Sequence, residues 1–129
     1  MEAPGLSLEV FLQFKLTDRI YLLSLRDIDQ VIDVPGIYEL PGAHSNILGL
    51  INYNSKIVPV VSINTRLHLR GTAVTKKSKV LIVTYKNELV GILVDEIIKS
   101  IALDADRIKE LKTQNQSFSS SFLELENIL

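Results

Sequence analysis

The feature that most constrains the fold of this chain is a pattern of short strands that occurs twice, 69 residues apart. Phe11–Val34 aligns with Val80–Leu103 without a gap, and apolar residues coincide at eleven of the 24 positions. About five coincidences are expected by chance at this composition. The repeat favours two similar units. The alternative is that any two strand meanders resemble each other in a chain where Leu, Ile and Val supply 46 of 129 residues.

The first copy of the pattern predicts three short strands. Glu9–Leu16 alternates polar and apolar side chains, which is typical of a half-buried strand. A polar turn follows, and Ile20–Leu25 is expected to return as the second strand, with Gln30–Val34 as the third. Ser24 is placed to cap a single helical turn between the second and third strands.

Between the two copies lies a predicted hairpin, Gly49–Val61. Two runs rich in strand-forming residues flank Asn54 and Ser55, which we expect to form a tight two-residue turn. Serine tolerates the left-handed conformation of such a turn poorly. Pro59 has no N–H to donate to a ladder, so its strand is expected to be an edge or bulged at that point.

The remaining segments carry weaker signals. We expect a short helix over Ile63–Leu69, a connector over residues 70–78, one helical turn capped by Asp104, a polar segment over Thr113–Ser121 and a last strand over Phe122–Leu125. Many short strands separated by turns predict an all-β fold, either a sandwich or barrels. The repeat favours two small barrels.

Enzymatic activity is not expected from the residue types present. The chain has no cysteine, and its two histidines, His44 and His68, have no evident catalytic partners. Neither a nucleophile elbow nor a glycine-rich phosphate loop occurs. Asp95 and Glu96 are adjacent on a strand and point to opposite faces, so Asp95 is expected to bind backbone N–H groups at a turn. We therefore predict no catalytic residue, no metal and no cofactor.

The charge distribution leaves two other functions open. Between Leu40 and Asn87 there is no Asp or Glu, and seven Lys and Arg residues give this segment a charge of +7. Its basic run, Arg66–Lys79, would suit a nucleic-acid-binding barrel, although the run contains no aromatic residue for base stacking. Exposed barrel edges would suit a structural homo-oligomer. The sequence has no apolar run long enough for a membrane span and no signal-peptide pattern, so we expect a soluble, cytoplasmic protein.

The predicted hairpin also resembles the CheW-like domain, the adaptor module of bacterial chemosensory arrays. That family shows the pattern Gly-x-Ile/Val-Asn-Leu-Arg-Gly-x-Ile/Val-Ile/Val-Pro-Val. Weaker similarities lie in Leu40–Ala43, Gly91–Ile97 and Leu123–Leu129, so the resemblance spans nearly all of the chain from about Leu8. The residues that match the hairpin pattern are Gly49, Ile51, Asn52, Ile57, Val58, Pro59 and Val60.

The resemblance implies a fold and a function. It implies one CheW-like domain over residues 1–129, built of two packed, five-stranded SH3-like barrels with approximate subdomains 8–69 and 79–129. It also implies a non-enzymatic adaptor that couples the tips of methyl-accepting chemoreceptors to the regulatory domain of a CheA-type histidine kinase. In such adaptors the groove between the barrels takes the receptor's helical hairpin, and one barrel meets the kinase domain end to end.

Two departures from the family bear on the predicted contacts. The family's Arg-Gly is replaced by Asn54-Ser55, and the family's Glu is replaced by Gln30. The resemblance implies a salt bridge between this Arg and Glu; here both charges are absent together, and two neutral amides able to hydrogen-bond take their places. We expect either a neutral exchange or an altered receptor preference. The predicted positions that contact a partner or shape the contact surface are Ile28, Gln30, Gly49, Ile51, Asn54, Val58 and Val94.

Overall fold

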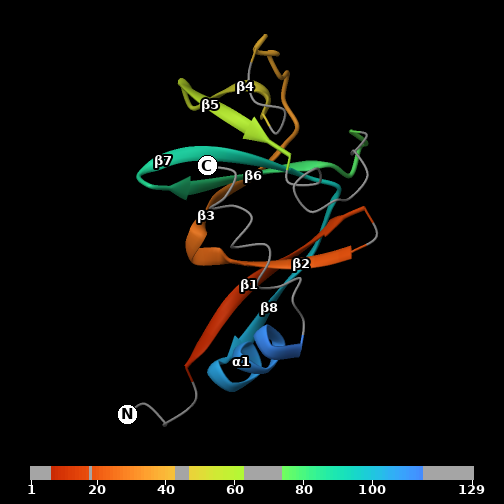
Figure 1. Cartoon of the computed structure of the whole chain (residues 1–129), viewed down its shortest axis with the longest axis vertical. Helices are drawn as coiled ribbons and strands as arrows, with labels where there is room; N and C mark the ends of the chain where they lie inside the picture. The colour runs from red at the N-terminus through yellow and green to blue at the C-terminus, as the bar shows by residue number, and fades with distance from the viewer. Residues whose placement is uncertain (1–6, 18, 43–46, 63–73, 115–129) are drawn as a thin grey trace.

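Two β-sheets and one helix make up the described part of the chain (Figure 1). The computed structural model describes residues 7–17, 19–42, 47–62 and 74–114. In chain order the elements are β1 (Leu8–Leu16), β2 (Arg19–Ser24), the 3-10 turn η1 (Leu25–Asp27), β3 (Ile28–Asp33), β4 (Ile47–Tyr53), β5 (Lys56–Val61), β6 (Lys79–Tyr85), β7 (Glu88–Val94), β8 (Glu96–Asp104) and α1 (Ala105–Gln114). One sheet has the order β2-β1-β8 and the other β3-β6-β7-β5-β4.

The local predictions for the strands are confirmed. Each of the first three predicted strands is present, with ends shifted by one or two residues. The Ser24 side chain caps η1 by accepting a hydrogen bond from the Arg26 backbone N–H at 3.3 Å. Asn54 and Ser55 both have positive φ, 49° and 65°, as the two-residue turn between β4 and β5 requires. The Ser55 N–H is bound by the side chain of Asn52, which supports the turn.

The predicted edge character at Pro59 is also confirmed. β5 pairs with β4 along its length, but it pairs with β7 only at Val60 and Val61. Pro59 therefore lies just before the second ladder begins, where its missing N–H leaves no bond unmade.

The repeat is confirmed down to residue register. Phe14 lies opposite Tyr21 in the first hairpin, and Val83 lies opposite Val90, 69 residues later, in the second. The third strand of each copy is exchanged, because β3 pairs with β6 and β8 pairs with β1. Each sheet thus takes strands from both sides of the predicted connector, and the assignment of subdomains to residues 8–69 and 79–129 stays a prediction.

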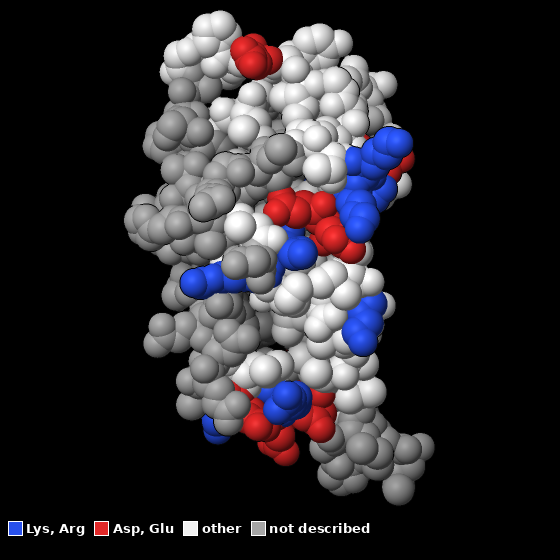
Figure 2. All heavy atoms as spheres, turned by 90° about the vertical axis from the view of Figure 1, so that its right-hand side faces the viewer, with Lys and Arg blue, Asp and Glu red and all other residues white. Residues whose placement is uncertain are grey.

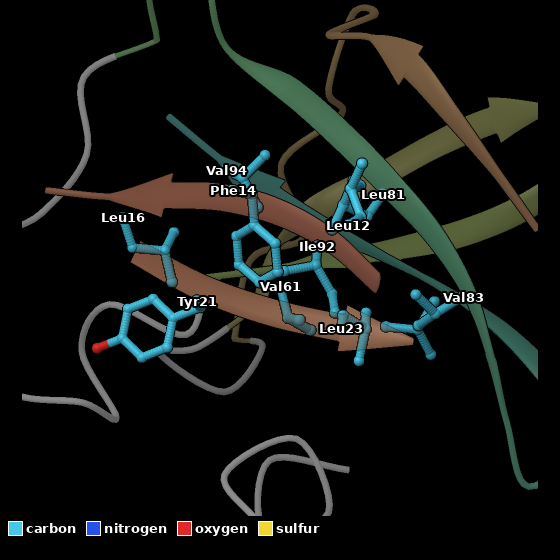
Figure 3. Packing of buried hydrophobic residues seen from close by; sticks show 11 residues of the cluster. Leu12, Phe14, Leu16, Tyr21, Leu23, Val61, Leu81, Val83, Ile92 and Val94 are labelled. Atoms are coloured by element: carbon cyan, nitrogen blue, oxygen red, sulfur yellow. The ribbon is translucent and has the colours of Figure 1, made fainter. Parts of the chain in front are cut away.

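The largest apolar cluster lies between the two sheets (Figure 3). Side chains from β1 and β2 face those from β6 and β7. The Phe14 and Tyr21 rings stack with their centroids 6.2 Å apart. The buried members are Leu12, Phe14, Leu16, Tyr21, Leu23, Val61, Leu81, Val83, Val90, Ile92 and Val94. Through this cluster the two sheets pack against each other, which confirms the predicted all-β fold of two packed units.

Two smaller clusters complete the core. One lies on the opposite face of the five-stranded sheet from the largest cluster and includes Ile51, Tyr53 and Val58. The other lies on the outer face of the three-stranded sheet, where Ile108 and Leu111 of α1 pack near Phe11 and Leu22. The three-stranded sheet is therefore covered on both faces.

The helix α1 is longer than predicted. Asp104 caps it as expected, its Oδ1 accepting from the Arg107 N–H at 2.8 Å. The expectation of a single turn is wrong, because the helix continues to Gln114. Among residues 105–111, whose side chains the structure describes, Ile108 and Leu111 pack on the sheet, an apolar pattern too sparse to mark the length of the helix. The predicted helix Ile63–Leu69, the strand Phe122–Leu125, most of the polar segment Thr113–Ser121 and both histidines lie outside the described residues.

Asp95 joins the two sheets where β7 turns into β8. Its backbone N–H donates to the Lys15 carbonyl at 2.9 Å, and its Oδ2 accepts from the Thr17 N–H at 2.5 Å. Thr17 has φ 60° and lies at the turn between β1 and β2. The prediction that Asp95 satisfies a backbone N–H at a turn is therefore confirmed.

Candidate partner-binding surface

The structure brings β3 close to the turn between β4 and β5, although β3 and β4 are the two end strands of the five-stranded sheet. The connection is made by Tyr53, the last residue of β4. Its hydroxyl oxygen lies 2.8 Å from Asp29 Oδ2 and 2.7 Å from Gln30 Oε1. Asn54 follows Tyr53 directly, so two predicted contact positions, Gln30 and Asn54, lie on either side of this connection. The side-chain hydrogen bond that the structure gives Gln30 is made with the Tyr53 hydroxyl.

The hydrogen-bond chemistry at Tyr53 has one consistent assignment. A phenol carries a single proton, and the charged Asp29 carboxylate is its stronger acceptor. Gln30 Oε1 lies 2.7 Å from the same hydroxyl as a second, uncharged acceptor. The pKa of Tyr53 is raised, first by the hydrogen bond to Asp29, then by burial and by the charge of Asp29. The phenol therefore stays protonated around neutral pH.

Three of the predicted positions are part of the core. Ile51, Val58 and Val94 are at most 1% exposed, so none of them reaches a partner in this conformation. Ile51 and Val58 pack in the cluster of the five-stranded sheet, and Val94 packs between the sheets. Ile28, at the start of β3, is half-buried against the same cluster as Val94. Their predicted role in shaping a contact surface stays a prediction.

Gly49 is buried where the segment before β4 crosses that strand. The backbones of Tyr38 and Leu50 exchange two hydrogen bonds of 2.8 Å. A Cβ at position 49 would collide with the Tyr38 carbonyl oxygen and lie 2.7 Å from Ile37 Cγ2. Only glycine leaves room for this crossing, which partly covers the outer edge of β4.

Asp29 and Tyr53 were not identified by the sequence analysis. The available signal was the alternation of β4, which places Tyr53 on the same inward face as Ile51. A buried tyrosine hydroxyl needs a hydrogen-bond partner. Which residue supplies that partner depends on how the sheet curls, and this is not written in local sequence.

A separate apolar groove of about 580 Å³ lies beside β1, η1 and α1. Arg26 and Glu9 form an ion pair of 2.9 Å at this groove. None of the predicted contact positions lines it. Its apolar lining residues include Leu8, Val10, Leu25, Leu103 and Ile108.

The charges of the described residues do not form one large basic face in the view of Figure 2, where Lys and Arg lie in separate groups, several beside Asp or Glu. Lys79 of the basic segment pairs with Asp33, and the pKa of Asp33 is lowered by that hydrogen bond and by the lysine charge. Lys86 lies 5.1 Å from the centroid of the Tyr85 ring. No cluster of three or more metal-binding side chains occurs within the described residues.

The two hairpins, each completed by a strand from the other copy of the repeat, define a class: a small all-β protein of two packed sheets. The comparison with known sequences makes the assignment specific. A profile of the CheW-like domain matches residues 10–128. The chain therefore belongs to the CheW-like domain family.

Individual relatives agree with this assignment. The chain is similar to the chemotaxis protein CheW of Treponema pallidum, with 23% identity over 74% of this chain and 59% of that protein. It is 20% identical to the CheW of Helicobacter pylori over 84% of this chain and 68% of that protein. The Protein PilI of Pseudomonas aeruginosa is 22% identical, over 75% and 54% respectively. The chain thus spans about half to two-thirds of the length of these relatives.

A solved structure supports the fold. The crystal structure of the scaffolding protein TtCheW from Thermoanaerobacter tengcongensis superposes with a TM-score of 0.74 at 26% identity. The match covers 78% of this chain and 68% of that protein.

Proposed function

We propose that this chain is a non-enzymatic adaptor in a bacterial chemosensory array, which couples chemoreceptor tips to the regulatory domain of a CheA-type histidine kinase. The observation that carries the proposal is the family profile over residues 10–128, together with the paired-sheet fold shared with a scaffolding protein. A cytoplasmic location belongs to the same proposal. Among the described residues no helix has the length and apolar character needed to cross a bilayer.

The proposed receptor contact lies on the surface of β3 and the β4–β5 turn. Gln30 and Asn54 are exposed there, and Gly49, Ile51 and Val58 hold the strands beneath it. Ile28 and Val94 connect this region to the cluster between the sheets.

The first test is a binding titration against a CheA-type regulatory domain and, separately, against a receptor-tip hairpin. Binding to both supports the adaptor. Binding to neither contradicts the proposal. Affinity for nucleic acid that falls steeply with salt would then favour the basic-run function. A size that depends on concentration would favour the homo-oligomer.

A variant pair tests the contact surface. Gln30→Glu with Asn54→Arg introduces the charge pair typical of the family, and we expect it to change receptor affinity while kinase-domain affinity stays constant. Asn87→Arg with Thr84→Glu is the matched control, because Asn87 occupies the corresponding turn of the second hairpin with φ 66°. Equal receptor affinity in the test variant, the control and the native chain would exclude the proposed contact.

A further inference from the structure

The five-stranded sheet has no backbone ladder between its two ends in the described part of the chain. There β3 pairs with β6, and β4 pairs with β5 and with the single residue Tyr38. An edge strand held by one ladder separates more easily than a central strand. The position of β3 relative to the β4–β5 turn therefore depends on side-chain contacts.

Tyr53 supplies such a contact between the two end strands. Its ring belongs to the buried cluster of Ile51 and Val58, and only 8% of the residue is exposed. Packing of the ring fixes the hydroxyl in space. The hydroxyl in turn reaches Asp29 at 2.8 Å and Gln30 at 2.7 Å, both on β3. Besides its ladder with β6 and the packing of Ile28 and Ile32, β3 is thus attached to the core through this side chain.

We propose that Tyr53 is a positioning residue: its hydroxyl ties β3 to the β4–β5 hairpin and so fixes where Gln30 and Asn54 are presented to a partner. The role of these two residues in receptor contact rests on the function proposed above. The tie itself does not, because it follows from the distances around one phenol oxygen. Its loss leaves the fold intact but lets the two contact residues move independently.

The first experiment needs no partner. Amide hydrogen exchange of β3 is compared in the native chain and in Tyr53→Phe, which keeps the ring and removes the hydroxyl. We expect exchange in β3 to become about 3- to 10-fold faster, with β7 unchanged. Tyr38→Phe is the matched control, since Tyr38 is 72% exposed and the same atom is removed. Native exchange rates in β3 of Tyr53→Phe would overturn the proposal.

A second variant removes the acceptor of the Tyr53 hydrogen bond and leaves Tyr53 itself unchanged. Asp29→Ala removes the charged acceptor from an exposed position and leaves the aromatic ring and its packing in place. We expect faster exchange in β3 here too, and a lower pKa of Tyr53 followed by ultraviolet absorbance. A Tyr53 that titrates as in the native chain would show that Asp29 does not hold the phenol, which contradicts the proposed tie.

Partner binding then separates the two proposals. If Tyr53 positions the contact residues, Tyr53→Phe weakens binding of the receptor hairpin about 3- to 10-fold and leaves kinase-domain binding unchanged. Equal loss of both would mean a general loss of structure and would contradict a positioning role. If the native chain does not bind the hairpin at all, the proposed function fails, and the exchange rates of β3 alone decide the role of Tyr53.

Discussion

Replacing Asp95 by alanine removes the side-chain bond that links the turn after β7 to the turn after β1. The bond joins Asp95 Oδ2 to the Thr17 N–H at 2.5 Å, across 78 residues of sequence. The second contact, from the Asp95 N–H to the Lys15 carbonyl, is made by the backbone and survives the substitution. The perturbation is therefore confined to one charge-assisted hydrogen bond.

The expected loss follows from two opposing effects. A hydrogen bond to a charged group contributes about 1.5–3 kcal/mol to the free energy of unfolding. Asp95 Oδ1 is buried without a hydrogen-bond partner in the described structure, so removing it recovers part of that loss. We expect a net loss of about 1–2 kcal/mol. For a chain of 129 residues this lowers Tm by about 4–8 °C.

Asp95→Asn is the control that separates the acceptor from the charge. Its amide oxygen still accepts from the Thr17 N–H, so we expect a loss of only about 0.5–1 kcal/mol. Thermal unfolding followed by circular dichroism, checked by urea titration, measures all three chains. A Tm for Asp95→Ala within 1 °C of the native value (about 0.3 kcal/mol) would refute the reasoning. A loss in Asp95→Asn as large as in Asp95→Ala would assign the effect to charge.

Three further predictions concern the core and the surface. Gly49→Ala should cost about 2–3 kcal/mol in urea unfolding because its Cβ meets a backbone carbonyl, whereas Gly36→Ala, with open space around it, should cost less than about 0.5 kcal/mol. Val94→Ala should cost about 2 kcal/mol by the same measurement, and Val74→Ala, which is 56% exposed, should cost almost nothing. If the two substitutions of either pair cost the same, the burial argument is wrong. The lowered pKa of Asp33 means that its ion pair stabilises the fold above pH 3.8 and that this contribution is lost as the pH falls through the lowered value. Asp33→Asn should therefore reduce the loss of stability on acidification, most clearly at low ionic strength, and an unchanged pH profile would contradict this.

Much of the local structure could be predicted from short-range patterns. Alternation of side chains locates β1, because a strand with one buried face must place apolar residues at every second position. Asn54-Ser55 marks the turn between β4 and β5 even though serine is a poor residue for positive φ, since the flanking strands leave only two residues to reverse the chain. These features depend on neighbours in sequence.

The pairing of the third strands could not be predicted in the same way. Alternation states which face of β3 is buried, but not which strand lies beside it. The repeat predicted two equal units and was silent on the exchange of β3 and β8 between them. Pairing of residues far apart in the chain is decided by the burial of the whole core, where both sheets share one apolar cluster.

The sequence by itself determined the strands, the turns, the repeat and the family, because each depends on residue types at fixed short spacings. Only the tertiary structure decided that Tyr53 would meet Asp29 and Gln30, 24 and 23 residues away. That contact exists because the five-stranded sheet curls until its end strands approach each other. The curl is a property of the packed sheet as a whole, so no single stretch of sequence encodes it.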